Sequence, residues 1–104
     1  MKQIKLFELV GSFAEDKDAA AKLRRDVILP TLKGGGSVEI DFFGVTLTTQ
    51  SFIHALISQA LRQEGEEALA RMKFKNCGSA ARGIIETVVQ YVLESVAGEG
   101  ESDV

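Results

Sequence analysis

Three hydroxyl residues lie close together in the sequence, where a predicted strand is followed by a predicted amphipathic helix. Thr48 and Thr49 fall between a predicted strand at 38–43 and a predicted helix at 50–63, and Ser51 is the second residue of that helix. The unpaired amides and positive dipole end of a helix amino terminus favour a phosphoryl group or an acidic side chain. We therefore expect a binding surface here, the alternative being that a hydroxyl only caps the helix.

A second candidate site combines a glycine turn with two basic side chains. Gly78 and Ser79 precede the last predicted helix, Lys75 lies just before them, and Arg82 falls in the first helical turn. A cation at a helix amino end is unfavourable unless an anion is bound there, and a guanidinium binds anions well. These four residues form a candidate anion site, with a plain helix cap as the alternative.

The other reactive side chains lack the partners that catalysis requires. Cys77 has no base beside it, because the single histidine, His54, follows a different strand. We expect His54 to be solvated on the polar side of its helix. Glu39 and Asp41 share one face of a strand with lysines nearby, which favours a solvated ion-pair face over acid–base catalysis. We expect no catalytic residue, no metal site and no cofactor.

The elements that would position these residues alternate between strand and helix. Alternation of apolar and polar residues predicts strands at 2–10, 38–43 and 71–75. The spacing of Ser12 and Glu15 predicts a capping box that opens the first helix, which should kink or end near Pro30. The helix at 50–63 should bury one face, made of Phe52, Ile53, Leu56, Ile57, Ala60 and Leu61.

The order of the elements predicts the fold class. An exposed interruption at 64–67 separates the second helix from the third strand, and the last helix begins at Gly78-Ser79. Strand–helix alternation implies a mostly parallel sheet. Each strand alternates apolar with charged residues, so one face of the sheet should remain wet. We predict an α/β fold, a two-layer sandwich with helices on one face and the strand at 38–43 in the centre.

Composition indicates one small globular domain. The chain has 104 residues, 45% hydrophobic and 26% charged. Three of its 15 acids lie in 98–104, and removing them leaves 12 acidic against 12 basic residues. We therefore predict a domain over 1–97 with a flexible acidic tail over 98–104. A neutral domain argues against nucleic-acid binding. The absence of a long apolar run argues against a membrane partner or a secretory leader, and the single cysteine favours the cytoplasm.

The stretch at 38–52 carries a family resemblance. Its Asp-Phe-Phe-Gly-Val strand end and Ser-Phe helix start resemble an uncharacterised STAS-like family, relatives of the anti-sigma-factor antagonists. The relevant positions run from 2 to 94, and the resemblance implies a STAS-like sandwich. It also implies a bacterial, non-enzymatic regulatory module for protein–protein interaction, as in partner switching. The partner would be a histidine-kinase-like ATPase or another regulator, bound through the loop formed by Thr48, Thr49, Ser51 and Phe52.

The resemblance also bears on phosphorylation. In the antagonists this loop has an acid followed by two hydroxyl residues, the first of which a partner kinase phosphorylates. Thr49 and Gln50 stand at the first two positions here, and Ser51 matches the second hydroxyl. Ser51 is therefore the preferred acceptor, followed by Thr49 and Thr48. The antagonists have two strands before the first helix, whereas one is expected here.

Two other classes of function stay open. The first is a small-ligand or nucleotide (anion) sensor that uses the helix amino ends near Ser51 and at 78–82. The second is a stand-alone enzyme, which ranks last because the sequence shows no base–nucleophile pair. A homodimer could form through the exposed strand edges or the stripe of the last helix, the alternative being that this stripe packs wholly on the sheet.

Overall fold

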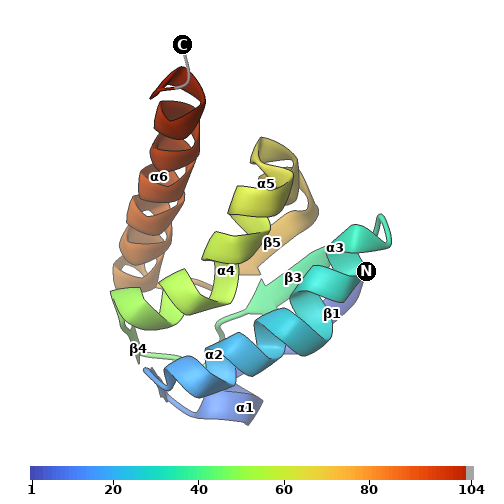
Figure 1. Cartoon of the computed structure of the whole chain (residues 1–104). Coiled ribbons are helices and arrows are strands. Elements are labelled where there is room, and N and C mark those ends of the chain that lie inside the picture. The colour runs from blue at the N-terminus through green and yellow to red at the C-terminus, as the bar shows by residue number, and fades with distance from the viewer. Residues whose placement is uncertain (103–104) are drawn as a thin grey trace.

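A three-stranded sheet organises the chain (Figure 1). The computed structural model describes the backbone of residues 1–102 and the side chains of residues 1–96. The strands are β1 (Lys2–Lys5), β3 (Val38–Asp41) and β5 (Met72–Lys75), in the order β1-β3-β5. Both pairings are parallel. The predicted parallel sheet with the second predicted strand at its centre is therefore confirmed.

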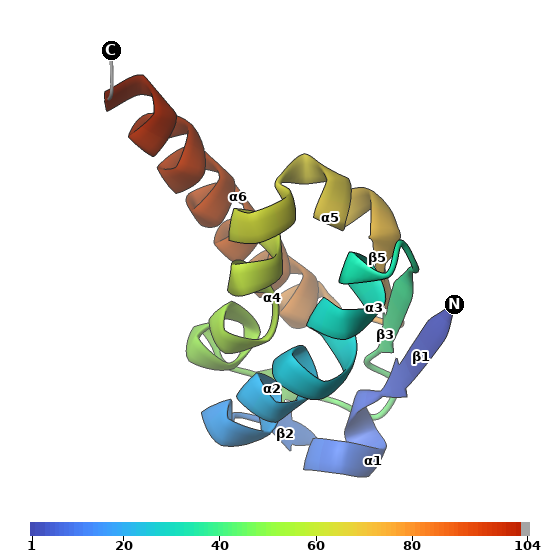
Figure 2. The same ribbon diagram turned by 45° about the vertical axis from the view of Figure 1, so that its right-hand side comes forward.

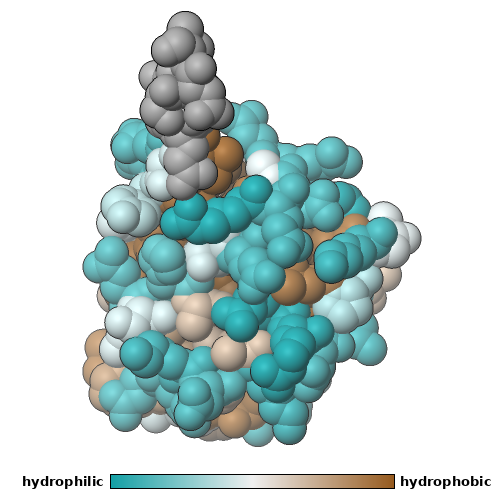
Figure 3. All heavy atoms as spheres, viewed as in Figure 1, coloured by the Kyte–Doolittle hydropathy of each residue, from teal (hydrophilic) through white to brown (hydrophobic). Residues whose placement is uncertain are grey.

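The helices lie on one side of this sheet (Figures 1 and 2). Val38 and Ile40 of β3 are fully buried on that side, together with Ile4 and Met72 of the outer strands. The alternate positions carry the charged residues, as expected for a period of two. The structure thus confirms the predicted two-layer sandwich. The helical side presents mainly hydrophilic side chains, with apolar patches between them (Figure 3).

A second, two-stranded sheet was not predicted. It pairs β2 (Phe13–Ala14) with β4 (Leu47–Thr48) in parallel. The carbonyl of Ser12 accepts hydrogen bonds from the amides of Thr46 at 2.8 Å and Leu47 at 3.2 Å. The chain therefore has two strands before its first long helix, which corrects the expectation of one. Strands of two residues are too short to show an alternating pattern.

The first predicted strand is also shorter than expected. β1 ends at Lys5, and the next five residues form a short helix, α1 (Leu6–Val10). Leu6 is buried and Val10 half-buried. Residues four positions apart share a face in both a helix and a strand, so the pattern at 6 and 10 fits either element. The predicted strand at 2–10 is therefore wrong beyond Lys5.

The first long helix begins later than the capping box predicted. α2 (Lys17–Leu23) starts after Asp16, whose carboxylate accepts hydrogen bonds from the amides of Asp18 at 2.9 Å and Ala19 at 3.3 Å. An aspartate is as good an N-cap as a serine. Ser12 instead leads into β2, so its predicted role as the N-cap is wrong.

Pro30 is accommodated by a change of helix type. A π-helical turn, η1 (Arg24–Ile28), links α2 to α3 (Leu29–Lys33), where Pro30 occupies the first turn. The amide of Leu29 bonds to the carbonyl of Arg24, five residues back. The wider turn precedes the proline, whose ring would otherwise clash with a carbonyl of a regular helix. The helix then ends three residues after Pro30, near the predicted position.

The second long helix follows the prediction closely, and the segment after it does so in part. α4 (Gln50–Glu64) buries all six predicted stripe residues. Gly65 alone interrupts the chain, because Glu66 and Glu67 open a further helix, α5 (Glu66–Arg71). The predicted exposed interruption at 64–67 is therefore too long. Acidic residues suit the first turn of a helix, where they face its positive dipole end.

The last helix, α6 (Ser79–Ser102), begins where expected and packs against α4. Val88 and Val92 of α6 are fully buried in the core. The helical backbone continues past residue 97, which agrees with the low cost of extending an existing helix. The side chains of the predicted acidic tail, and all of residues 103 and 104, lie outside the described residues, so its flexibility stays a prediction.

Within residues 1–102, no helix combines the length and apolar character needed to cross a bilayer.

Candidate functional site

Two of the three hydroxyls before α4 are engaged in holding the fold. The hydroxyl of Thr48 donates to the carbonyl of Ala14 at 2.9 Å, which ties β4 to β2. The hydroxyl of Thr49 accepts from the amide of Phe52 at 3.1 Å and is the N-cap of α4. The capping alternative therefore holds for Thr49, and both threonine hydroxyls already take part in hydrogen bonds of the fold.

Ser51 is the exposed hydroxyl of the group. It lies in the first turn of α4 and lines an open depression of about 500 Å³ with Lys17, Gln50, His54 and Ala55. Among the described residues its hydroxyl has no hydrogen-bond partner. The ammonium of Lys17 and the amino end of α4 both favour negative charge at this place. The depression can therefore receive an anionic group.

His54 connects this depression to α6. Its side chain is half-buried, and its ring centroid lies 6.0 Å from that of Tyr91, with the rings tilted by 57°. This is the geometry of a tilted aromatic pair. The expectation of a simply solvated histidine is therefore corrected. The contact was hidden from the sequence because it joins two helices that are distant along the chain.

The structure removes Phe52 from the predicted surface. Its side chain is fully buried among the core residues. Phe52 belongs to the apolar stripe of α4, which faces the sheet, whereas Ser51 points away from it. The predicted inclusion of Phe52 in a partner-binding surface is therefore corrected. Phe52 packs in the core and anchors the start of α4.

The predicted anion site does not assemble as a group of four. Phe74 and Lys75 are consecutive on β5 and so lie on opposite faces of the sheet. Arg82 lines a cavity together with Phe74, on the helical side. Lys75 lies on the other face, paired in register with Asp41. Gly78 and Ser79 are exposed at the start of α6, and the amide of Arg82 bonds to the carbonyl of Gly78 at 2.9 Å. The structure therefore separates Lys75 from the other three.

Asp41 is held as a carboxylate at the end of β3. One of its oxygens accepts hydrogen bonds from the side-chain amide of Asn76 and from the backbone amide of Phe43, each at 2.9 Å. These bonds, with the positive charges of Lys75 and Lys5, hold the pKa of Asp41 below its ordinary value of 3.8. Charged residues share this face as predicted, but among the described residues neither Glu39 nor Asp41 forms an ion pair. The partner atoms within hydrogen-bonding distance of the Asp41 carboxylate are amide nitrogens.

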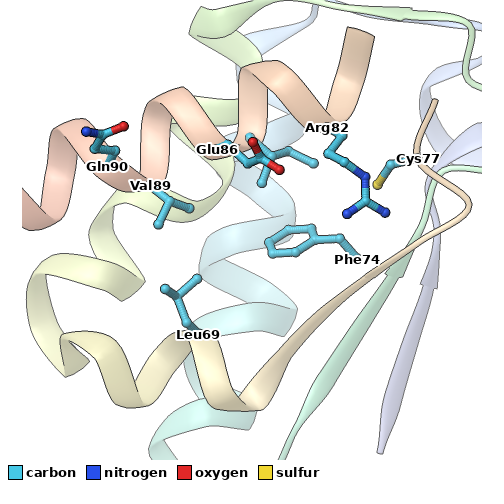
Figure 4. A pocket seen from close by; sticks show the side chains of 8 residues that line it. Leu69, Phe74, Cys77, Arg82, Glu86, Val89 and Gln90 are labelled. Atoms are coloured by element: carbon cyan, nitrogen blue, oxygen red, sulfur yellow. The ribbon is translucent and has the colours of Figure 1, made fainter. Parts of the chain in front are cut away.

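A cavity of about 350 Å³ lies between α5, β5 and α6 (Figure 4). Figure 4 shows the guanidinium of Arg82 turned toward Phe74 and Cys77 at one end of it. Burial raises the pKa of the Cys77 thiol, partly opposed by the charge of Arg82, so the thiol is protonated at neutral pH. The sequence does not reveal this cavity, because α5, which supplies Leu69, begins within the predicted exposed interruption at 64–67. Its lining residues are Leu69, Phe74, Cys77, Arg82, Ile85, Glu86, Val89 and Gln90.

Within the described part of the chain, no three His, Cys, Asp or Glu side chains are grouped closely enough to hold a metal ion.

A parallel sheet covered by helices on one face, with an exposed strand-to-helix loop, defines a two-layer α/β domain. The family described as a STAS-like domain of unknown function (DUF4325) matches residues 19–81, more than half of the chain. The chain belongs to this STAS-like family, which confirms the resemblance. No curated protein and no solved structure matches the chain significantly.

Proposed function

We propose that this STAS-like domain is a non-enzymatic regulatory module that binds a protein partner through the amino end of α4. Ser51 is its phosphate acceptor. The resemblance to anti-sigma-factor antagonists points to a histidine-kinase-like ATPase, or another regulator, as the partner. Membership in a STAS-like family supports the regulatory class, and the geometry around Ser51 supports the place of contact.

The observation that carries the proposal is the different use of three neighbouring hydroxyls. The hydroxyl of Thr48 bonds to β2, and the hydroxyl of Thr49 caps α4. Ser51 is exposed beside the cationic Lys17. Phosphorylation of Thr48 would remove the proton that it donates to Ala14, and phosphorylation of Thr49 would place a phosphoryl group on the oxygen that caps α4. Phosphorylation of Ser51 disturbs no hydrogen bond among the described residues.

A phosphate on Ser51 would change the surface without opposing the fold. It adds a charge of about −1.5 to −2 at neutral pH. Negative charge in the first turn of a helix stabilises it by about 0.3–1 kcal/mol. The fold therefore tolerates both states, while a partner that contacts the depression encounters a reversed local charge. This is the requirement for a switch in binding.

Affinity capture with matched variants tests the proposal. The tagged domain is incubated with an extract of its native cells, with ATP or with ADP, and captured proteins are quantified by mass spectrometry. Wild type should recover an ATPase-like regulator in a nucleotide-dependent manner, and phosphate should appear on Ser51. Ser51→Asp should reduce recovery by about tenfold or more, because a misplaced charge in an interface costs several kcal/mol.

Thr87→Asp is the control, since it places the same charge on an exposed face of α6. It should leave recovery unchanged. Circular dichroism should show that both variants are folded. Equal recovery by Ser51→Asp and wild type would remove Ser51 as the switch, and loss of recovery by Thr87→Asp would remove α4 as the specific contact.

A further inference from the structure

The cavity under α6 combines an apolar lining with one cation, Arg82, that forms no ion pair within residues 1–96. Phe74, Ile85 and Val89 supply much of its wall, and Arg82 lies at one end (Figure 4). The ion pairs formed within the described residues do not include Arg82. A concave apolar site with a few placed polar groups is the usual form of a small-molecule site.

The amino end of α6 adds to the positive potential at the same place. The first helical hydrogen bond of α6 runs from the amide of Arg82 to the carbonyl of Gly78, so the preceding amides have no partner inside the helix. These amides and the helix dipole favour an anion near Arg82. The half-buried Cys77 does not oppose it, because its thiol is uncharged at neutral pH.

We propose that this cavity binds a small amphiphilic carboxylate, with the carboxylate at Arg82 and an apolar chain lying along Phe74, Ile85 and Val89. The cavity volume of about 350 Å³ fits the size of the ligand. At about 30 Å³ for each water-sized group, it holds roughly twelve non-hydrogen atoms, enough for octanoate. This site is independent of Ser51 and of the partner proposed above.

Glu86 also lines the cavity and sets the orientation of the ligand. It lies one helical turn beyond Arg82, and the two side chains do not form an ion pair in the structure. An Arg that precedes a Glu by four residues is the weaker order for a helical pair. The carboxylate of the ligand therefore belongs at the Arg82 end, away from Glu86. Removal of the Glu86 charge should strengthen binding.

Isothermal titration with octanoate, supported by amide chemical shifts, tests the site on the whole chain. Octanoate should bind and shift amides of β5 and the first turns of α6, whereas octylamine and acetate should bind far more weakly. Arg82→Gln should weaken octanoate binding by about tenfold, the usual value of one hydrogen-bonded charge. Glu86→Gln should tighten it by a few-fold.

Two further variants test whether octanoate binds inside the cavity rather than elsewhere on the domain. Lys75→Gln is the matched control, since it removes a cation from the same segment but from the opposite face of the sheet, and it should leave the affinity unchanged. Val89→Phe should fill the cavity and abolish binding while circular dichroism stays that of wild type. The assignment is overturned if octylamine binds as tightly as octanoate, if Arg82→Gln binds like wild type, or if no octanoate binding is measurable.

Discussion

At the scale of single residues, hydrogen bonds decide which polar side chains can serve a ligand. Thr48 and Thr49 are committed to the fold, whereas Ser51 is not. Asp41 shows the same principle at the end of β3, because one of its carboxylate oxygens accepts hydrogen bonds from Asn76 and from a backbone amide. The two proposals rest on side chains that make no such bond within the described residues, the hydroxyl of Ser51 and the guanidinium of Arg82.

The Asp41 cluster predicts a specific response to acid. Because the folded pKa of Asp41 lies below its ordinary value of 3.8, the carboxylate stabilises the fold above that pH. This stability is lost as the pH falls from 3.8 through the folded pKa. Asp41→Asn keeps an oxygen that can accept both hydrogen bonds but cannot titrate. Its free energy of unfolding in urea should therefore fall less than that of wild type between about pH 6 and about pH 2.5.

A carboxyl NMR titration checks the cause. Asn76→Ala should raise the pKa of Asp41 toward 3.8, and by more than Lys75→Gln does, because the Asn76 hydrogen bond is the largest contribution. A carboxyl pKa that is unaffected by Asn76→Ala would contradict this account of the cluster.

At the scale of elements, one close contact positions the turn that leads to α4. Gly44 follows β3 with a φ of +89°, and a β-carbon built there would lie 2.8 Å from the ring of Phe7 in α1. Any other residue would meet both a steric clash and a backbone conformation that L-amino acids avoid. The turn between β3 and β4 can therefore pack on α1 only because residue 44 is glycine.

Gly44→Ala should consequently lower the free energy of unfolding by about 1–3 kcal/mol. In a Phe7→Ala background the clash is relieved, so the same change should cost only the backbone part, about 1–2 kcal/mol or less. Urea unfolding measures both values. Gly83→Ala is the control, since this helical glycine of α6 has open space around it and should gain about 0.5–1 kcal/mol. Equal costs of Gly44→Ala in the two backgrounds would exclude the steric explanation.

At the scale of the whole molecule, one core joins the sheet to the helices. Phe52, Ile40 and Val88 come from α4, β3 and α6 and are all fully buried in it. The candidate surface at Ser51 and the cavity at Arg82 lie at the amino ends of two helices that pack on each other. Any variant that loosens this core would therefore affect both sites through the fold.

Variants of Phe52 test whether this residue acts only through the core or also contacts the partner. Phe52→Ala should cost about 3–5 kcal/mol, a large share of the roughly 5–15 kcal/mol that stabilises a typical domain. Phe52→Leu retains most of the buried volume and should cost about 1.5 kcal/mol or less. If Phe52 acts only through the core, folded Phe52→Leu captures the partner as wild type does. A folded Phe52→Leu variant that loses the partner would return Phe52 to the interface.

Much of the fold could be predicted where a single element buries one face. The apolar stripe of α4 and the solvent-exposed face of the sheet follow from periodicity, because side chains repeat every 3.6 residues in a helix and every two in a strand. The central place of β3 follows from its acidic residues, Glu39 and Asp41, which pair favourably with a basic strand on either side. The family resemblance likewise rested on contiguous residues, those at 38–52. These features depend on residues that are close together in the sequence, so they can be predicted without knowing which distant segments pack against them.

Other features depended on contacts between distant segments. The β2–β4 pairing bonds Thr48 to Ala14, which are 34 positions apart, and it displaced the predicted cap at Ser12 in favour of Asp16. The contact of His54 with Tyr91 has the same origin.

The sequence by itself thus determined the class of fold and the loop that carries Ser51. Only the tertiary structure decided that Ser51 alone among the three hydroxyls is open, and that Arg82 and Lys75 lie on opposite faces. The physical reason is that availability to a ligand depends on which partners packing brings to a polar group, and those partners come from elsewhere in the chain.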